Sequence, residues 1–148
     1  MNLLIRLITP ADFASCAQSL VAAFAEPPWN ECWTFEQAHT RIDELMASRM
    51  SRGYVLSDDN IIIAMCIGRI MTYLDWQEFF VDEFSVHPVY QKQGLGGELL
   101  DYAKTQLSQE NVNDMILNTE KGSPAVKFYE KNAFRIVDRV AFMSCEWE

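Results

Sequence analysis

The feature that most constrains the fold is a strand pattern followed directly by a glycine-rich turn and a helical pattern. Phe79 to Val86 reads as a strand ended by Pro88, and a helix with regularly spaced apolar residues begins near Gly96. Met115 to Leu117 reads as the next strand. A strand, a helix and a strand in this order form a parallel pair in one sheet, with a right-handed crossover. The order predicts an α/β or α+β fold.

The rest of the chain adds antiparallel strands and further helices to this unit. Apolar periodicity and capping residues predict a strand at Leu3 to Ile8, a helix that starts at Thr9-Pro10, a helix capped by Thr34 and Gln37, strands at Tyr54 to Leu56 and Ile61 to Met71, a helix at Pro124 to Lys131, and a strand pair or one long strand from Phe134 onward. The hairpin before the crossover makes the predicted sheet mixed. The expected architecture has three layers.

Length and hydropathy limit the class of protein. The chain has 148 residues, 49% of them apolar, and is predicted to form one domain over residues 1–148. Its longest apolar run, residues 61–67, is far shorter than the roughly 20 residues that cross a membrane. The N-terminus lacks the charged start and long apolar block of a signal peptide. A cytoplasmic protein without membrane association is the expectation.

The charge balance limits the partners. Twelve basic and 21 acidic side chains give a net charge of −9, which argues against nucleic acid, whose binding depends on Lys and Arg contacts to phosphates. The charge favours cationic or amine-bearing ligands, although solubility alone is a competing explanation. The four cysteines and two histidines lack the spacing of metal ligands, so no metal is predicted.

The glycine-rich turn has the chemistry of a phosphate site. Gln91 to Gly96 reads Q-x-x-G-x-G directly after a strand, and a helix N-terminus that a ligand can approach closely suits a phosphate or pyrophosphate. The turn is not a dinucleotide fingerprint, because Leu99 stands where that motif needs glycine. It is not a P-loop either, because Glu98 follows Gly97. A helix start that binds nothing is the alternative.

The turn resembles the acetyl-CoA pyrophosphate loop of the GNAT N-acetyltransferase superfamily, R/Q-x-x-G-x-G/A. Two further segments carry the resemblance: Glu83 to Pro88 is similar to the strand that pairs with pantetheine, and Ala125 to Phe134 to the family's A-x-x-x-Y-E-K-x-G-F segment. The sequence departs from the family at Gly122, where many relatives have asparagine, and at Ala133, where they have glycine. The resemblance implies a single-domain fold with a mixed, mostly antiparallel sheet, a splayed central parallel strand pair and helices on both faces.

The resemblance also implies a site for acetyl-CoA as cosubstrate. Its pyrophosphate would lie on the backbone amides of residues 93–97, and its pantetheine would lie along the preceding strand as an added strand does. Many relatives have an asparagine at the position of Gly122 that contacts the cofactor. In this chain that contact is either missing or made by Ser123 instead. The implied cofactor-binding residues are Phe84, Ser85, Val86, Gln91, Lys92, Gln93, Gly94, Leu95, Gly96, Gly97 and Ser123.

Two residues are expected to move protons while the amine attacks directly in a ternary complex. Tyr129 matches the family's general acid, which protonates the departing thiolate; a core aromatic is the alternative reading, because Phe128 and Ala125 share its helical spacing. Glu83 is the first choice of base, since partial burial beside the thioester would raise its pKa. A chain of waters acting as base, and a carboxylate that is merely solvated, are the alternatives. Asp82 is the alternative carboxylate base, but strand alternation predicts that Asp82 and Glu83 face opposite sides of the sheet, so the two are not expected to share the site.

The acceptor side is predicted from charge and from one loop. Four acids and no Lys or Arg lie between Ile70 and Gln91, which suits a cationic amine. In the family, the loop between the first two helices determines acceptor specificity, and here it carries two tryptophans and a carboxylate that could line a cationic or sugar ligand. The alternative is that the tryptophans pack the two helices together. The predicted substrate-binding residues are Trp29, Glu31, Trp33 and Asp82.

The leading functional hypothesis is acetyl transfer from acetyl-CoA to a small primary amine: a polyamine, an aminoglycoside or an amino-acid derivative. The second is a protein acetyltransferase acting on lysine or an N-terminus. The third is a non-catalytic acyl-CoA-binding sensor module. A monomer and a homodimer are both compatible with the sequence.

Overall fold

The computed structural model describes residues 1–147. The chain divides into two compact units, residues 1–118 and residues 119–148. The first unit contains β1 (Leu3–Leu7), a 3₁₀ turn (Pro10–Asp12), α1 (Phe13–Ala25), α2 (Phe35–Leu45), β2 (Ser51–Asp58), β3 (Ile61–Tyr73), β4 (Trp76–Val86), a second 3₁₀ turn (Pro88–Tyr90), α3 (Leu95–Gln109) and β5 (Asp114–Ile116). The second unit contains α4 (Pro124–Lys131).

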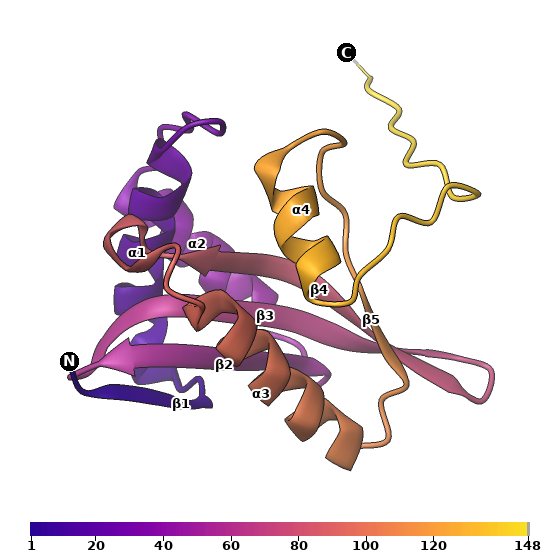
Figure 1. Cartoon of the computed structure of the whole chain (residues 1–148), viewed down its shortest axis with the longest axis horizontal. Helices are drawn as coiled ribbons and strands as arrows, with labels where there is room; N and C mark the ends of the chain where they lie inside the picture. The colour runs from indigo at the N-terminus through magenta and orange to yellow at the C-terminus, as the bar shows by residue number, and fades with distance from the viewer. Residues whose placement is uncertain (148) are drawn as a thin grey trace. The chain divides into compact units, whose positions relative to one another are not determined.

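The first unit is built on a five-stranded sheet in the order β1-β2-β3-β4-β5 (Figure 1). Neighbouring strands from β1 to β4 are antiparallel, and β5 joins β4 in parallel through the α3 crossover. The mixed sheet predicted from the hairpin and the crossover that follows it is therefore confirmed. Figure 1 shows α3 in front of this sheet and α1 and α2 behind it, so helices cover both of its faces.

The central strand β3 is buried on both faces. Its residues 62–68 are all buried, which explains a continuous apolar run where a half-exposed strand would alternate. On one face, Met65 and Ile67 join the apolar side chains of α1 and α2. On the other face, the ring of Tyr54 lies 6.3 Å from that of Phe79 and 6.2 Å from that of Tyr102 on α3. Each layer of helices therefore has its own core against the sheet.

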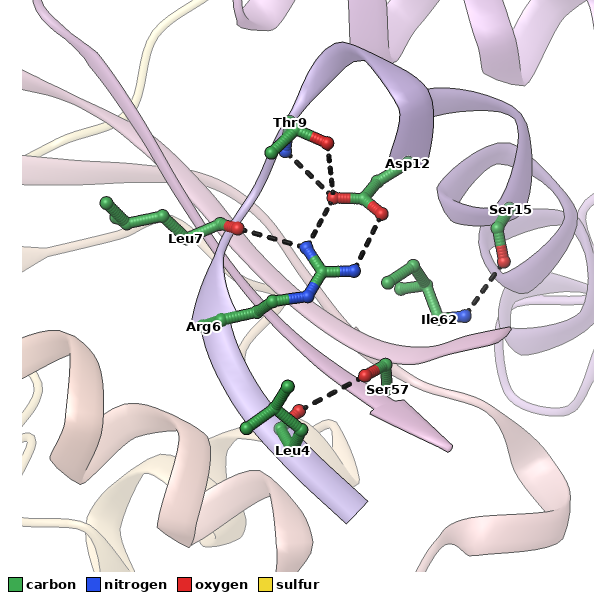
Figure 2. Close-up of polar contacts among 8 residues, drawn as sticks. All are labelled: Leu4, Arg6, Leu7, Thr9, Asp12, Ser15, Ser57 and Ile62. Atoms are coloured by element: carbon green, nitrogen blue, oxygen red, sulfur yellow. Dashed lines mark hydrogen bonds and ion pairs between the residues drawn. The ribbon is translucent and has the colours of Figure 1, made fainter. Parts of the chain in front are cut away.

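The N-terminal helix begins with a 3₁₀ turn that an ion pair holds in place (Figure 2). The guanidinium of Arg6 donates to both carboxylate oxygens of Asp12, at 2.7 and 2.9 Å, and the backbone N–H of Thr9 donates to the same carboxylate at 2.8 Å. The backbone N–H of Ile62 in β3 donates to the hydroxyl of Ser15 in α1 at 2.8 Å. These bonds attach the start of α1 to two strands of the sheet.

Asp12→Asn is expected to lower the free energy of unfolding at neutral pH by about 1.5–3 kcal/mol, the usual contribution of a hydrogen bond with a charged group. The hydrogen bonds from Arg6 hold the pKa of Asp12 below its ordinary value of 3.8, against the effect of burial. Because the folded-state pKa is the lower one, the contribution is present above about pH 4 and disappears as the pH falls through the folded-state pKa. Denaturant titrations of both proteins from neutral to acidic pH measure the difference. A difference that stays constant across this range would contradict the assignment.

The second unit contains α4 and the segments before and after it. The helix extends from Pro124 to Lys131 as predicted. The strand pair or long strand predicted from Phe134 onward is wrong: residues 134–147 contain no strand. Alternating apolar residues favour a strand, but a strand also needs backbone hydrogen bonds to a neighbouring strand. Among the described residues, the ladders of the sheet end with β5.

Candidate active site

The glycine-rich turn lies where the chain leaves β4 and enters α3. Gly94 is the N-cap residue of α3 and has a φ of +79°, in the left-handed region that glycine adopts most easily. A Cβ at Gly94 would meet no atom within 4 Å, so the space beside this backbone is open. The first N–H groups of a helix have no partner inside the helix. The start of α3 therefore offers hydrogen-bond donors beside an open backbone surface.

Two glutamines of the turn hydrogen-bond to the backbone that precedes it. Nε2 of Gln91 donates to the carbonyl of Val86 at 2.9 Å, and Nε2 of Gln93 donates to the carbonyl of Val89 at 3.3 Å. Gln91 thus attaches the turn to the end of β4, and Gln93 attaches it to the second 3₁₀ turn. In this arrangement the backbone of the turn, rather than its amide side chains, is available to a ligand.

The parallel strands β4 and β5 separate beyond a short ladder. β5 pairs only with Glu78 to Phe80, and residues 81–86 of β4 continue past the last pair. The parallel pair that the family resemblance implies is confirmed, but in the described residues it lies at the edge of the sheet and not at its centre, because no strand pairs with the other side of β5. Phe84, Ser85 and Val86 lie on the diverging part. The hydroxyl of Ser85 is buried and has no hydrogen-bond partner in the part of the chain that the structure describes.

A β-bulge determines where the acidic side chains of β4 point. Ile67 of β3 pairs with Glu83, whereas the next residue, Gly68, pairs with Val81, so Asp82 is an extra residue in β4. An extra residue shifts the alternation of side chains by one position. Asp82 and Glu83 therefore face the same side of the sheet, and the prediction that they face opposite sides is wrong.

Each of these carboxylates has an arginine partner. Nε and Nη2 of Arg69, in β3, donate to the two oxygens of Asp82 at 2.8 and 2.9 Å. Nε of Arg41, in α2, donates to the carboxylate of Glu83 at 2.6 Å, and its Nη2 donates to the carbonyl of Asp82 at 3.1 Å. Two of the four acids between Ile70 and Gln91 are thus neutralised by arginines from other elements.

Glu83 lies in a dry environment, with 7% of its surface exposed. Burial raises the pKa of its carboxyl, because desolvation disfavours the charged form, and the guanidinium of Arg41 opposes this increase. The negative charges of Glu31 and Asp82 lie close enough to raise the pKa further. A buried carboxyl with a raised pKa can accept a proton from a bound amine.

An open groove of about 360 Å³ borders Arg41. It is lined by Trp33, Gln37, Arg41, Glu44 and Leu45. The indole N–H of Trp33 donates to Glu31 at 2.8 Å, while the ring packs against the core of α1 and α2. Trp33 therefore fits both predicted roles, since it lines the groove and also packs the two helices together. The ring of Trp29 instead lies 5.9 Å from that of Phe24 and does not line the groove, which favours a packing role.

Two predicted site residues belong to the second unit. Ser123 is the N-cap residue of α4, and its hydroxyl is buried without a hydrogen-bond partner among residues 1–147. Tyr129 is half-buried on α4, with its ring 5.3 Å from that of Phe128 and 5.2 Å from that of Phe134. These ring contacts concern the packing of Tyr129 and not its hydroxyl.

Sequence reasoning missed the side chains that reach the site from distant positions. Arg41 and Arg69 are 42 and 13 residues from their partners Glu83 and Asp82. The hydroxyl of Tyr90, just before the glycine-rich turn, donates to Asp58 at 2.8 Å across 32 residues of sequence. No local sequence pattern predicts such pairs, because the two partners lie on different elements and are brought together only by the fold.

Within residues 1–147, no group of three or more His, Cys, Asp or Glu side chains is arranged to hold a metal ion. Over the same range, every helix is too short or too polar to cross a lipid bilayer.

Known proteins share the sequence pattern and the fold of this chain. The profile of the acetyltransferase (GNAT) family matches residues 17–134. No curated protein matches the chain significantly in sequence. A possible acetyltransferase from Clostridium difficile 630 has a TM-score of 0.78 at 17% identity, covering 100% of this chain and 98% of that chain.

Two further solved structures are aminoglycoside acetyltransferases. The enzyme meta-AAC0020 from an uncultured soil metagenomic sample has a TM-score of 0.77 at 13% identity, covering 99% of this chain and 97% of that chain. The 6'-N-acetyltransferase AAC(6')-IG from Acinetobacter haemolyticus has a TM-score of 0.75 at 13% identity, covering 98% and 99%. At such identities the likeness concerns the fold.

Proposed function

This chain belongs to the acetyltransferase (GNAT) family, and on that premise we propose that it transfers an acetyl group from acetyl-CoA to a small primary amine. The observation that carries the proposal is the turn from Gln91 to Gly97, which follows β4, starts α3 and leaves open space at Gly94. The family match covers residues 17–134 and so includes parts of both units.

Acetyl-CoA supplies the acetyl group as an activated thioester. The backbone N–H groups of residues 93–97 would bind its pyrophosphate, because the start of a helix carries partial positive charge. Lys92, exposed beside the turn, would add a cation. Residues 84–86, on the diverging part of β4, would bind the pantetheine as an added strand. The open space at Gly94 and the unpartnered hydroxyl of Ser85 support this fit.

Glu83 and Tyr129 would move the protons of the reaction. Glu83 would accept a proton from the amine, so that one N–H bond breaks, an O–H bond forms on the carboxylate, and the nitrogen lone pair becomes nucleophilic. Tyr129 would donate a proton to the thiolate sulfur of CoA as it leaves. Both substrates are bound at once in this scheme, so no residue of the chain becomes acetylated.

A small cationic amine is the acceptor class that we favour. The net charge of −9 attracts cations, and the groove beside Arg41 carries an aromatic ring and the carboxylate of Glu44. Solved relatives of the same fold include aminoglycoside acetyltransferases, one of them in complex with sisomicin, which is consistent with this class. The pairing of Asp82 and Glu83 with arginines reduces the local negative charge, leaving Asp75 and Glu78 of the acidic run.

An amine panel scored by free CoA formation tests this function. The panel contains diamines and polyamines, an aminoglycoside, amino acids and a lysine-containing peptide. We expect the highest kcat/KM for a small cationic amine, with a KM that rises with ionic strength because the Debye length falls from about 10 Å at 0.1 M salt to about 3 Å at 1 M.

Other outcomes of the panel contradict the proposal in distinct ways. A preference for the peptide would indicate a protein acetyltransferase. Thermal stabilisation by acetyl-CoA without release of thiol for any amine would indicate a non-catalytic sensor. A best acceptor that is anionic, or a KM that is independent of salt, would remove the electrostatic argument.

A further inference from the structure

Arg41 connects the open groove to the buried carboxylate of Glu83. Its side chain is 37% exposed and is part of the groove lining, whereas the side chain of Glu83 is 8% exposed. Its Nε donates to the Glu83 carboxylate at 2.6 Å, and its Nη2 donates to the neighbouring carbonyl of Asp82 at 3.1 Å. The guanidinium of Arg41 therefore lies between the Glu83 carboxylate and the groove, where a bound cation would also have to lie to contact Glu83.

We propose that Arg41 is a specificity-determining residue, whose guanidinium holds the place of the acceptor's ammonium group until the acceptor displaces it from Glu83. This inference rests on the proposed function, in which Glu83 accepts the proton of the amine. It assigns the acceptor to amines that arrive in their charged form.

Displacement of Arg41 selects for a cation because Glu83 is buried. A buried carboxylate that loses its counterion is strongly unfavourable, whereas one cation that replaces another keeps the charge balance. A neutral or anionic molecule that pushed Arg41 aside would leave the Glu83 carboxylate unpaired. An ammonium group satisfies both the charge and the hydrogen bond that the guanidinium Nε supplies.

The exchange also converts an inert ion pair into a reactive one. A guanidinium does not give up its proton in proteins, so the Arg41–Glu83 pair keeps Glu83 ionised and cannot neutralise itself. An ammonium in the same place can transfer a proton to the carboxylate, which yields a neutral amine and a neutral carboxylic acid. A dry environment favours this neutral pair.

The charges around Glu83 come from four elements. Arg41 and Glu44 belong to α2, Glu31 to the loop before it, Asp82 to β4, and Arg69 of β3 neutralises Asp82. Among these groups, only Arg41 hydrogen-bonds to the Glu83 carboxylate within residues 1–147. Removal of Arg41 thus leaves Glu83 beside Glu31 and Asp82, both negative.

The pH dependence of kcat/KM tests the first half of the proposal. A nearby opposite charge lowers the pKa of a carboxyl by about 1–3 units. Arg41→Gln should therefore move the acidic limb of the kcat/KM profile, where Glu83 becomes protonated, to higher pH by about that amount. Above the limb, the KM of a cationic amine should fall by on the order of tenfold, because no internal cation competes. Arg41→Lys keeps a cation and should leave the limb close to that of the unmodified protein.

Two controls separate this role from a structural one. In a Glu83→Gln background, Arg41→Gln should leave the residual pH profile unmoved, because Arg41 then has no carboxylate to hold. Arg52→Gln breaks the ion pair with Glu110 (2.8 Å), away from the groove lining, and should not move the limb. An acidic limb that Arg41→Gln does not move would overturn the proposal.

Nuclear magnetic resonance of the arginine Nε–H groups tests the displacement itself. The Arg41 signal is identified by its absence from Arg41→Gln, and the protein is titrated with the best amine of the panel, or with 1,4-diaminobutane if none is turned over; 1,4-butanediol and matched sodium chloride are the controls. The amine alone should shift the signal and speed its exchange with water. A signal unchanged by the amine at saturation overturns the inference, whether or not the amine is acetylated. A signal that shifts without thiol release for any amine overturns the proposed function and supports the exchange.

Discussion

Tyr129→Phe is expected to lower kcat by about 10²–10⁴-fold, the range for the loss of a general acid. The substitution removes one hydroxyl and keeps the ring, which packs against Phe128 and Phe134. Stability should therefore change modestly, and affinity for acetyl-CoA should change little. The loss should appear in kcat, because the proton is delivered in the transition state. Single-turnover measurement of thiol release shows whether chemistry limits the rate.

Tyr102→Phe is the matched control for Tyr129→Phe. Tyr102 lies on α3, and its ring contacts that of Tyr54 with 6.2 Å between centroids. Loss of its hydroxyl should leave kcat unchanged. A folded Tyr129→Phe protein that binds CoA and keeps the kcat of the unmodified protein would show that Tyr129 is a core aromatic only. A fall smaller than about 10²-fold would mean that the thiolate leaves partly unassisted, since a thiol with a pKa of about 8.5 is already a tolerable leaving group.

Gly94→Trp is expected to weaken acetyl-CoA binding by at least about 100-fold. The Cβ of a side chain at Gly94 would lie in open space, more than 4 Å from any atom beyond the neighbouring residues, and a large side chain there would keep a pyrophosphate from the backbone N–H groups. Hydrogen bonds with charged groups contribute about 1.5–3 kcal/mol each, and about 1.4 kcal/mol corresponds to a tenfold change in affinity. The loss of two such hydrogen bonds is therefore sufficient to weaken binding about 100-fold. Calorimetric titration with CoA and acetyl-CoA measures the effect.

Gly94→Ala separates the size of the side chain from the backbone conformation. Both variants place a side chain at a φ of +79°, so both carry the same backbone cost of about 1–2 kcal/mol. Their thermal stabilities should therefore be similar, while the tryptophan variant binds CoA more weakly. Equal CoA affinity of Gly94→Trp and the unmodified protein would rule out this turn as the pyrophosphate site. Gly96 is less suitable for this test, because it is buried in the first turn of α3 and a large side chain there would disturb packing.

Local sequence patterns were sufficient for most elements. The capping box predicted at Thr34 and Gln37 is present, with the backbone N–H of Gln37 donating to the Thr34 hydroxyl at 3.1 Å and that of Thr34 donating to the Gln37 side chain at 2.9 Å. Helix α4 has its predicted bounds, and the crossover through α3 produces the parallel pair. These features depend on residues within a few positions of one another, so short-range hydrogen bonding and periodicity determine them.

Features that depend on partners distant in sequence were decided only in the folded chain. The apolar alternation after Phe134 predicted a strand, but no ladder in the described residues includes it, and strand formation requires a neighbouring strand. The bulge at Asp82 depends on how β4 aligns with β3, which the sequence of β4 does not specify.

The same distinction applies to the candidate site. The motif of residues 91–97 is contiguous, because a phosphate-binding turn needs only a few adjacent backbone groups and a helix start. The environment of Glu83 is assembled from α2, β3 and β4, and its charge balance depends on an arginine 42 residues away. Coulomb interactions and desolvation act through space. The residue types of the site could therefore be predicted from the sequence, whereas the ion pair that controls Glu83 required the tertiary structure.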